Sequence, residues 1–355
     1  MSLEVIYVTR HGFRSAWNVD PSTGNYTAFI RSPTGLPTDP ALVAHGVEQS
    51  NELAAHLQDV NPRIDQVYSS PYYRCMQTIH PFVRSRKPVP TGPSEDVSEE
   101  ESFKIRVDLG LSEWYGLAHF EHPSSAPLNE LQGFFPEIDA TYESSQAPPL
   151  NGESLSQLHH RVATAVDSLI RRSDQEGHKA VLICTHAAVV IALGRCLTGQ
   201  ADKDFGAFTC GLSKYKRRWS NTIGAPTNLG TGTRAMIPAA RDGRLIRETR
   251  SEDPARHVDL HQNGSKWTHL SSSETGTRDT GLYGGWACEL DSDCSFLRDG
   301  EERGWKFSGD ESFIETDENS SWSMDASNRS SKAISKTGIQ SHDSHIDPAG
   351  GISKL

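Results

Sequence analysis

Long apolar runs are absent from this 355-residue sequence. No segment approaches the ~18 consecutive apolar residues that a membrane-spanning helix needs, so the sequence predicts no transmembrane segment. The N-terminus, MSLEVIYVTR, enters a strand-like run at once, without the basic region and small-residue cleavage site of a secretory signal. We therefore expect a soluble protein of the cytoplasm, the nucleus or both.

Cysteine and net positive charge are also scarce. The six cysteines are scattered and form neither a Cys-x-x-Cys pair nor a zinc-ligand spacing, so we expect reduced thiols, no metal and no cofactor. The net charge is -11 and the isoelectric point lies near 5.7. Because nucleic acids and anionic membranes attract a positive field, we expect neither direct nucleic-acid binding nor membrane binding.

The apolar content is low for a chain that folds from end to end. Hydrophobic residues make up 35% of the sequence and the mean hydropathy is -0.55. Hydrophobic periodicity fades beyond Trp219. We therefore expect a folded domain over 1–219, a flexible insertion over 220–282 and a disordered tail over 316–355.

Between the insertion and the tail, residues 283–315 regain an alternating pattern. Trp286–Leu290 and Trp305–Phe307 alternate like edge strands on either side of a turn at Asp299-Gly300. We expect this hairpin to pair with Phe208–Tyr215 and to complete the first domain.

Apolar strands alternate with amphipathic helices along the first domain. Short runs rich in β-branched residues predict buried strands, and apolar residues at helical spacing predict the helices between them. This alternation indicates an α/β fold, a three-layer α/β/α sandwich on a mainly parallel sheet. The predicted strands are 3–9, 64–68, 105–109 and 180–184. The predicted helices are 48–57, one that starts near Pro71, 154–172 and 187–197, with Gly46 as a breaker before the first helix.

Histidine and arginine side chains gather at the ends of these predicted strands. His11 follows the first strand between Arg10 and Arg14, Arg74 follows the Ser-Ser-Pro turn after the second, and His186 ends the fourth. Ligands of open α/β sheets bind beyond the carboxyl ends of the strands, and phosphoryl transfer needs positive charge around the phosphate oxygens. Each residue taken singly has a structural explanation, as a solvated arginine or a buried structural histidine. Their combination favours a phosphate site.

Four ordered motifs resemble those of the histidine phosphatase superfamily, whose fold is phosphoglycerate mutase-like. They lie within residues 3–200 and are Val8-Thr9-Arg10-His11-Gly12, Ser69-Ser70-Pro71-Tyr72-Tyr73-Arg74-Cys75-Met76-Gln77-Thr78, Gly152-Glu153-Ser154 and Cys184-Thr185-His186-Ala187. The resemblance implies that 1–219 is a histidine phosphatase domain and that 283–315 is its closing hairpin.

The resemblance also implies a two-step reaction. Neutral His11 attacks phosphorus in line and forms a phosphohistidine, from which water then releases phosphate. Glu113 matches the family's proton donor to the leaving group, a role for which burial must raise its pKa. The phosphate pocket is expected to consist of Arg10, Arg14, Arg74 and a protonated His186.

Within the superfamily, the first motif and the Glu113-Trp114 turn are closer to one branch. That branch contains the protein phosphatases with ubiquitin-associated and SH3 domains and the fungal tau 55 kDa subunit of an RNA polymerase III transcription factor. The long segment Asn18–Pro40 also fits it and is expected to arch over the site as a specificity loop.

Some residues depart from the superfamily's usual pattern. Phe13 stands where mutase-type members have Glu, and Ala187 replaces the usual Gly of the last motif. Asn18 lies one place beyond the position of the family's phosphate-contacting Asn and is a further candidate contact.

These residues predict a phosphomonoesterase that acts on a phosphorylated small molecule or phosphopeptide. An alternative interpretation, from the tau 55 resemblance, is an assembly subunit of a transcription factor complex, in which the basic run Lys214–Arg218 contacts other subunits. A mutase is a third interpretation, which the altered start of the first motif disfavours.

Overall fold

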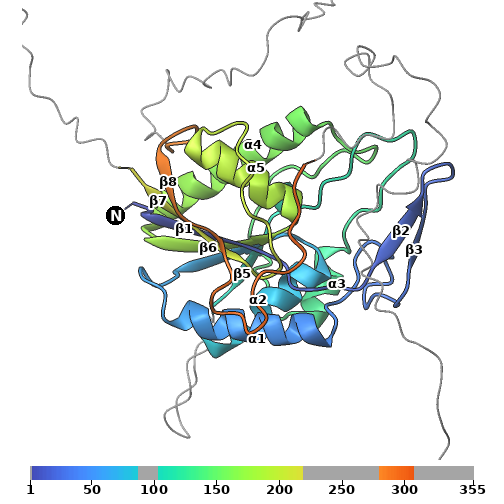
Figure 1. Cartoon of the computed structure of the whole chain (residues 1–355), viewed down its shortest axis with the longest axis horizontal. Helices are drawn as coiled ribbons and strands as arrows, with labels where there is room; N and C mark the ends of the chain where they lie inside the picture. The colour runs from blue at the N-terminus through green and yellow to red at the C-terminus, as the bar shows by residue number, and fades with distance from the viewer. Residues whose placement is uncertain (1, 87–102, 219–279, 308–355) are drawn as a thin grey trace, which may run out of the picture.

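The computed structural model describes residues 2–86, 103–218 and 280–307, and Figure 1 shows a sheet with helices on both sides. The strands, in the order β5-β4-β6-β1-β7-β8 across the sheet, are β5 (Ile105–Val107), β4 (Gln66–Ser69), β6 (Ala180–Thr185), β1 (Val5–Arg10), β7 (Leu212–Arg217) and β8 (Trp286–Asp293). The first four run parallel, and β7 is antiparallel to both of its neighbours. The predicted α/β sandwich on a mainly parallel sheet is thus confirmed.

Helices cover both faces of this sheet. α1 (Ala44–Gln58) and α2 (Tyr73–Ser85) lie on one face, and α4 (Leu155–Glu176) and α5 (Ala187–Thr198) lie on the other (Figure 1). Along β1, Val5 and Tyr7 belong to the core with α1 and α2, whereas Ile6 and Val8 belong to the core with α4 and α5. Both faces of β1 are therefore apolar, which explains its nearly continuous apolar run. Over the described ranges, no helix has the length and apolar character to cross a membrane.

Gly46 lies inside α1, contrary to the prediction that it would break the chain before a helix. A Cβ at this position would stand 2.0 Å from the carbonyl oxygen of Phe13. Glycine therefore lets α1 pack directly against the chain that follows His11, and this close approach outweighs the low helix propensity of glycine.

A hairpin and a short helix were not predicted from the sequence. β2 (Trp17–Asp20) and β3 (Asn25–Ala28) form a separate antiparallel hairpin, and α3 is a short helix over Leu128–Phe134. The hairpin occupies the first part of the predicted specificity loop. Its strands alternate between half-buried and exposed side chains, a weak pattern in four residues.

The C-terminal described residues form one strand. β8 pairs with β7, from Arg217 opposite Trp286 to Leu212 opposite Asp293. The predicted strand at Trp305–Phe307 is wrong, because these aromatic side chains pack around Trp114 instead, with ring centroids 6.4 Å and 5.5 Å from it. The predicted tail lies outside the described residues, as does the predicted insertion except for 280–282.

Candidate active site

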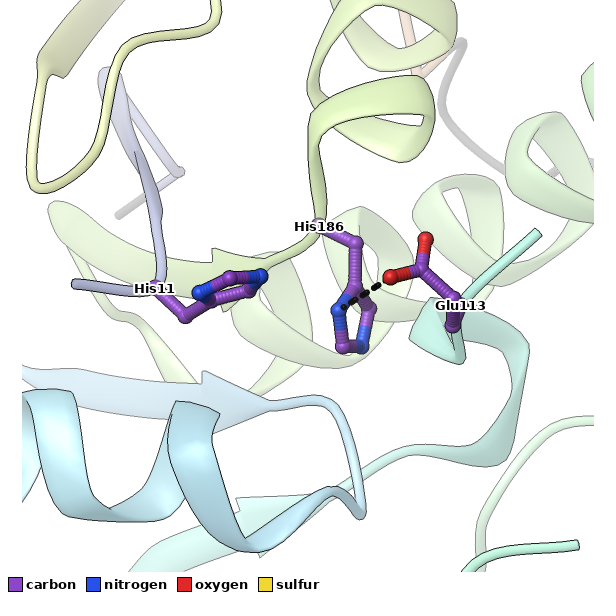
Figure 2. Close-up of side chains that lie close together, drawn as sticks. All are labelled: His11, Glu113 and His186. Atoms are coloured by element: carbon purple, nitrogen blue, oxygen red, sulfur yellow. Dashed lines mark ion pairs between the residues drawn. The ribbon is translucent and has the colours of Figure 1, made fainter. Parts of the chain in front are cut away.

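The strand register brings His11 and His186 together. Arg10 of β1 lies opposite Thr185 of β6, so the next residue of each chain segment emerges at the same edge of the sheet. The two imidazole rings lie side by side in an edge-on arrangement, with centroids 5.4 Å apart and an angle of 65° between the ring planes (Figure 2). β4 lies on the other side of β6, and the hydroxyl of Ser70 at its end is 2.7 Å from Nε2 of His186.

The His11 ring is buried and held in one tautomer. Nδ1–H donates to the carbonyl oxygen of Gly12 at 2.9 Å, which leaves the lone pair on Nε2. Burial, and then the charges of Arg74 and Arg10, keep the pKa of His11 well below its usual range. A neutral imidazole with an unprotonated ring nitrogen is the form that acts as a nucleophile.

Three guanidinium groups beside the histidines carry unused donors. The Nε–H groups of Arg10, Arg14 and Arg74 are buried and make no hydrogen bond to any described residue. A buried donor without an acceptor costs free energy, so their clustering indicates a place for an anion. Burial and nearby Arg74 lower the pKa of Arg14 to about 9, which leaves it charged at neutral pH.

The remaining nitrogens of these arginines fix their orientation. Nη1 of Arg10 donates to the carbonyl oxygens of Ala207 and Arg303 at 2.8 Å and 2.5 Å. Nη1 of Arg14 donates to the carbonyl oxygen of Ser15 at 2.9 Å. Such bonds preorganise the guanidinium groups before any anion arrives.

Arg74 is fully buried and is held by two carboxylates. Its Nη1 lies 3.2 Å from Oδ1 of Asp39 and its Nη2 lies 3.1 Å from Oε2 of Glu113. Burial lowers the pKa of Arg74, but the two carboxylates raise it by more. Asp39 also accepts the backbone N–H of Tyr73 at 2.8 Å. Sequence reasoning missed Asp39, because no local pattern marks a carboxylate that acts across the fold.

His186 makes contacts through both ring nitrogens. Nε2 contacts Ser70, and Nδ1 lies 3.2 Å from Oε2 of Glu113, the ion pair drawn in Figure 2. Burial opposes the charged ring, but the sulfur of Cys75, 3.6 Å from Nε2, and the Glu113 carboxylate together raise the pKa of His186. The pair with Glu113 therefore favours an imidazolium.

Glu113 differs from the expectation that its pKa would be raised. Burial does raise it, but the charges of His186, Arg74 and Arg14 lower the pKa of Glu113 well below its usual range. The carboxylate is the counter-ion of the cations around it.

The Gly152-Glu153-Ser154 motif holds the turn that carries Glu113. Glu153 forms a buried ion pair with Arg161 of α4, whose Nη1 donates to the carbonyl oxygens of Gly110 and Ser112 at 2.7 Å and 3.2 Å. The indole N–H of Trp114 donates to the carbonyl oxygen of Glu153 at 2.9 Å. The motif thus acts on the pocket indirectly, through the backbone on both sides of Glu113.

Aromatic side chains of the hairpin stand beside the pocket. Trp17 and Tyr26 have ring centroids 5.5 Å apart, and Trp17 lies 6.1 Å from Tyr115. The Arg14 guanidinium carbon is 5.7 Å from the Trp17 ring. Asn18 is exposed on β2, and the alternation of the strand points it away from the half-buried face of Trp17. The structure therefore does not bring Asn18 to the cluster, because strand geometry sends neighbouring side chains to opposite faces.

A metal ion fits this cluster poorly. His11, Glu113 and His186 offer ligand atoms within 4.8 Å of one another. The same place receives the positive charges of Arg10, Arg14 and Arg74, which lower the pKa of His11. A cation added among these charges is repelled, whereas an anion is attracted.

The parallel strands β5, β4, β6 and β1, with motif residues beyond their ends, define an α/β protein whose candidate site lies at the carboxyl edge of the sheet. The chain belongs to the histidine phosphatase superfamily (branch 1), whose family model matches residues 6–218. The family predicted from the four motifs is therefore confirmed.

Three curated relatives show how the similarity is distributed. The chain is 29% identical over 230 residues to the transcription factor tau 55 kDa subunit of Saccharomyces cerevisiae, covering 61% of this chain and 48% of that protein. It is 30% identical over 172 residues to the ecdysteroid-phosphate phosphatase of Drosophila melanogaster, covering 47% of this chain and 21% of that protein. It is 27% identical over 227 residues to human ubiquitin-associated and SH3 domain-containing protein A, covering 57% of this chain and 32% of that protein. The chain thus spans less than half of the length of each relative.

Solved structures are also similar to this chain. The ecdysone phosphate phosphatase from Bombix mori in complex with tungstate aligns with a TM-score of 0.44 at 19% identity, over 65% of this chain and 97% of that one. A phosphoglycerate mutase from Bacillus anthracis aligns with a TM-score of 0.38 at 18% identity, over 60% of this chain and 88% of that one.

Proposed function

We propose that this protein is a phosphomonoesterase that forms a phosphohistidine on His11. The observation that carries the proposal is the set of three buried, unpaired guanidinium Nε–H donors beside a neutral imidazole. The substrate is a phosphorylated small molecule or a phosphopeptide. Arg10, Arg14, Arg74 and His186 would hold the phosphate oxygens, since arginine forks and an imidazolium donate charge-assisted hydrogen bonds.

The chemistry would proceed in two displacements. Nε2 of His11 attacks phosphorus, the bond to the ester oxygen breaks, and Glu113 gives its proton to the departing alcohol. Water then attacks the phosphohistidine, Glu113 takes a proton from that water, and phosphate and neutral His11 are released.

The ionisation of Glu113 fits this sequence once substrate is bound. Without an anion, His186, Arg74 and Arg14 hold Glu113 as a carboxylate. A phosphate dianion would compete for the same cations and add negative charge beside Glu113, which raises the pKa of the carboxyl group. Substrate binding would therefore favour protonation of Glu113, which supplies the proton that the departing alcohol takes up in the first step.

Hydrolysis of an aryl phosphate by the full chain tests this function. His11→Ala should abolish the release of phosphate, and vanadate should inhibit the wild type. His160→Ala is the matched control, because His160 is an exposed histidine of α4. A folded wild-type protein that hydrolyses no phosphate ester in a panel of phosphopeptides, nucleotides and sugar phosphates would contradict the proposal.

A second function is suggested by the similarity to the tau 55 kDa subunit, which extends over 61% of this chain. We propose, as the alternative, a role as an assembly subunit of a nuclear transcription factor complex. The basic run Lys214–Arg218 keeps exposed positive charge for this role at Lys216 and Arg218. Lys214 and Lys216 pair with Glu289 at 3.0 Å and 3.7 Å, and Arg217 is buried against Asp174.

Affinity purification of the full chain from its native cell tests the assembly role. The expected result is co-purification of transcription factor subunits that survives a His11→Ala change. Purification of the protein without any such subunit would count against this role and leave the phosphatase proposal untouched.

A further inference from the structure

The segment that follows β8 returns to the first motif. Drawn in orange in Figure 1, it leaves the edge of the sheet and reaches α1, where Arg298 pairs with Glu48 at 2.7 Å. We call residues 299–307 the strap. It lies beyond residues 6–218, which the family model matches.

Glu302 ties the strap to α1. Its Oε2 accepts the amide N–H of Gln49 at 2.7 Å and lies 2.5 Å from Nε2 of His45. Gln49 is buried, and its own oxygen accepts the backbone N–H of Phe13 at 3.0 Å. The main-chain oxygen of Glu302 accepts the N–H of Thr209 at 3.1 Å. Glu302 thus connects α1, the first motif and the chain before β7.

The neighbouring residue, Arg303, contacts the phosphate pocket through its backbone. Its carbonyl oxygen accepts Nη1–H of Arg10 at 2.5 Å. Its φ is 47°, in the left-handed region that is costly for a residue with a side chain. Its guanidinium carbon lies 3.8 Å from the centroid of the Phe13 ring. A backbone in this conformation persists only where its surroundings hold it.

Arg10 depends on this contact for its orientation. Nη1 is occupied by the carbonyl oxygens of Arg303 and Ala207, whereas the buried Nε has no bond to a described residue. The two carbonyl groups therefore select which edge of the guanidinium faces the pocket. Loss of one of them leaves a half-buried guanidinium group with fewer constraints on its rotation.

We propose that Glu302 is a positioning residue for the phosphate-binding Arg10. By anchoring the strap to His45 and Gln49, it holds the Arg303 carbonyl in place and keeps the free edge of Arg10 turned toward the anion. The inference rests on the proposed phosphate pocket and adds to it a residue from outside the matched family region.

Equilibrium binding tests this role without requiring turnover. Titration calorimetry of the full-length protein with inorganic phosphate should show roughly tenfold weaker binding in Glu302→Ala, about the loss of one charge-assisted hydrogen bond. Glu302→Gln keeps an acceptor for Gln49 and should recover most of the affinity. Glu301→Ala is the matched control, because the exposed neighbour of Glu302 should bind phosphate like the wild type.

A double-mutant cycle separates positioning from a general structural effect. In an Arg10→Ala background, Glu302→Ala should cause no further loss of phosphate affinity, because the group that it positions is gone. Equal losses in both backgrounds, or wild-type affinity in folded Glu302→Ala, would overturn the role of Glu302 alone. If Glu302→Ala does not fold, His45→Ala replaces it in the test, because it removes a contact that α1 makes with the same carboxylate. His45→Ala should then lose part of the phosphate affinity. A wild type that binds no phosphate would overturn both this inference and the proposed function.

Discussion

Glu113 and His186 form an ion pair in the middle of the pocket, with Oε2 3.2 Å from Nδ1. The same carboxylate oxygen lies 3.1 Å from Nη2 of Arg74. Two donors expected to hold a phosphate, on Arg74 and His186, therefore contact the Glu113 carboxylate. If the proposed function holds, we expect Glu113 both to compete with a bound phosphate for these donors and to carry a proton beside it.

Glu113→Gln should separate these two effects. Phosphate should bind several-fold more tightly, because the amide no longer competes as a charge for Arg74 and His186. Turnover of an aryl phosphate should fall roughly a hundredfold or more, the usual effect of losing a general acid. Calorimetry and steady-state kinetics measure the two quantities, and Glu130→Gln on exposed α3 should change neither. Weaker phosphate binding in Glu113→Gln would contradict the competition.

The pKa values of His11 and His186 should depart from the ordinary value of 6.5 in opposite directions. Burial and nearby cations lower the pKa of His11, so its ring should stay neutral below pH 6.5 in the phosphate-free protein. The pKa of His186 is raised, because Cys75 and Glu113 outweigh burial, so its ring should stay protonated above that pH. NMR of the ring protons, assigned with His11→Asn and His186→Asn, measures both. A His11 ring that charges at or above pH 6.5 would contradict the environment described for it.

The lowered pKa of His11 also affects stability. Below pH 6.5 the unfolded chain takes up a proton at this residue while the folded chain does not, so acidification lowers the free energy of unfolding. His11→Asn should remove that part of the pH dependence. Urea unfolding at pH 7.5 and pH 5.5 compares the two proteins, and identical pH dependence in both would count against this assignment.

Arg74→Ala should destabilise the fold as well as the pocket. It leaves Asp39 buried without its cation, which costs about 3–5 kcal/mol in the free energy of unfolding. Arg74→Ala combined with Asp39→Ala should cost less than the sum of the two single changes, because neither charge then remains unpaired. The more accessible pair of Arg172 and Glu176 is the comparison, and Arg172→Ala should cost at most about 1 kcal/mol. Additive losses at Arg74 and Asp39 would argue against their coupling.

Arg161→Lys should reduce turnover more than phosphate binding. Lysine keeps the charge beside Glu153 but lacks the fork that also reaches the carbonyl oxygens of Gly110 and Ser112. The turn that carries Glu113 then loosens, and a misplaced acid lowers kcat by roughly tenfold. Phosphate affinity measured by calorimetry should stay within about twofold of the wild type, since Arg161 holds no pocket cation. Equal effects on kcat and on phosphate binding would show that the change spreads through the whole pocket.

The sequence predicted the parts of the fold that depend on local pattern. Apolar β-branched runs are typical of strands covered on both faces, and β1 and β6 formed where these runs lie. It did not predict the β2–β3 hairpin, whose short strands carry little pattern, or the packing of Trp305 and Phe307 around Trp114. The hairpin and the packing of these aromatic side chains depend on contacts with other parts of the folded chain, which form only once the sheet is in place.

The candidate site divides in the same way. His11, Arg10, Arg74 and His186 were found from the sequence, because each belongs to a motif at a strand end. Asp39 and Glu302 were not found, because each acts on residues far from it along the chain. Asn18, which the sequence already placed one residue beyond the family's position, lies on the exposed face of β2, because neighbouring residues on a strand point to opposite faces.

The order of residues by itself determined the family, the parallel core and the identity of the histidines and arginines that meet beyond it. Only the tertiary structure decided the ionisation of Glu113 and the orientation of Arg10. Charge state depends on which groups lie within a few ångströms, and orientation depends on which carbonyl groups accept from a side chain. Both are set by contacts between distant segments, which no local sequence pattern specifies.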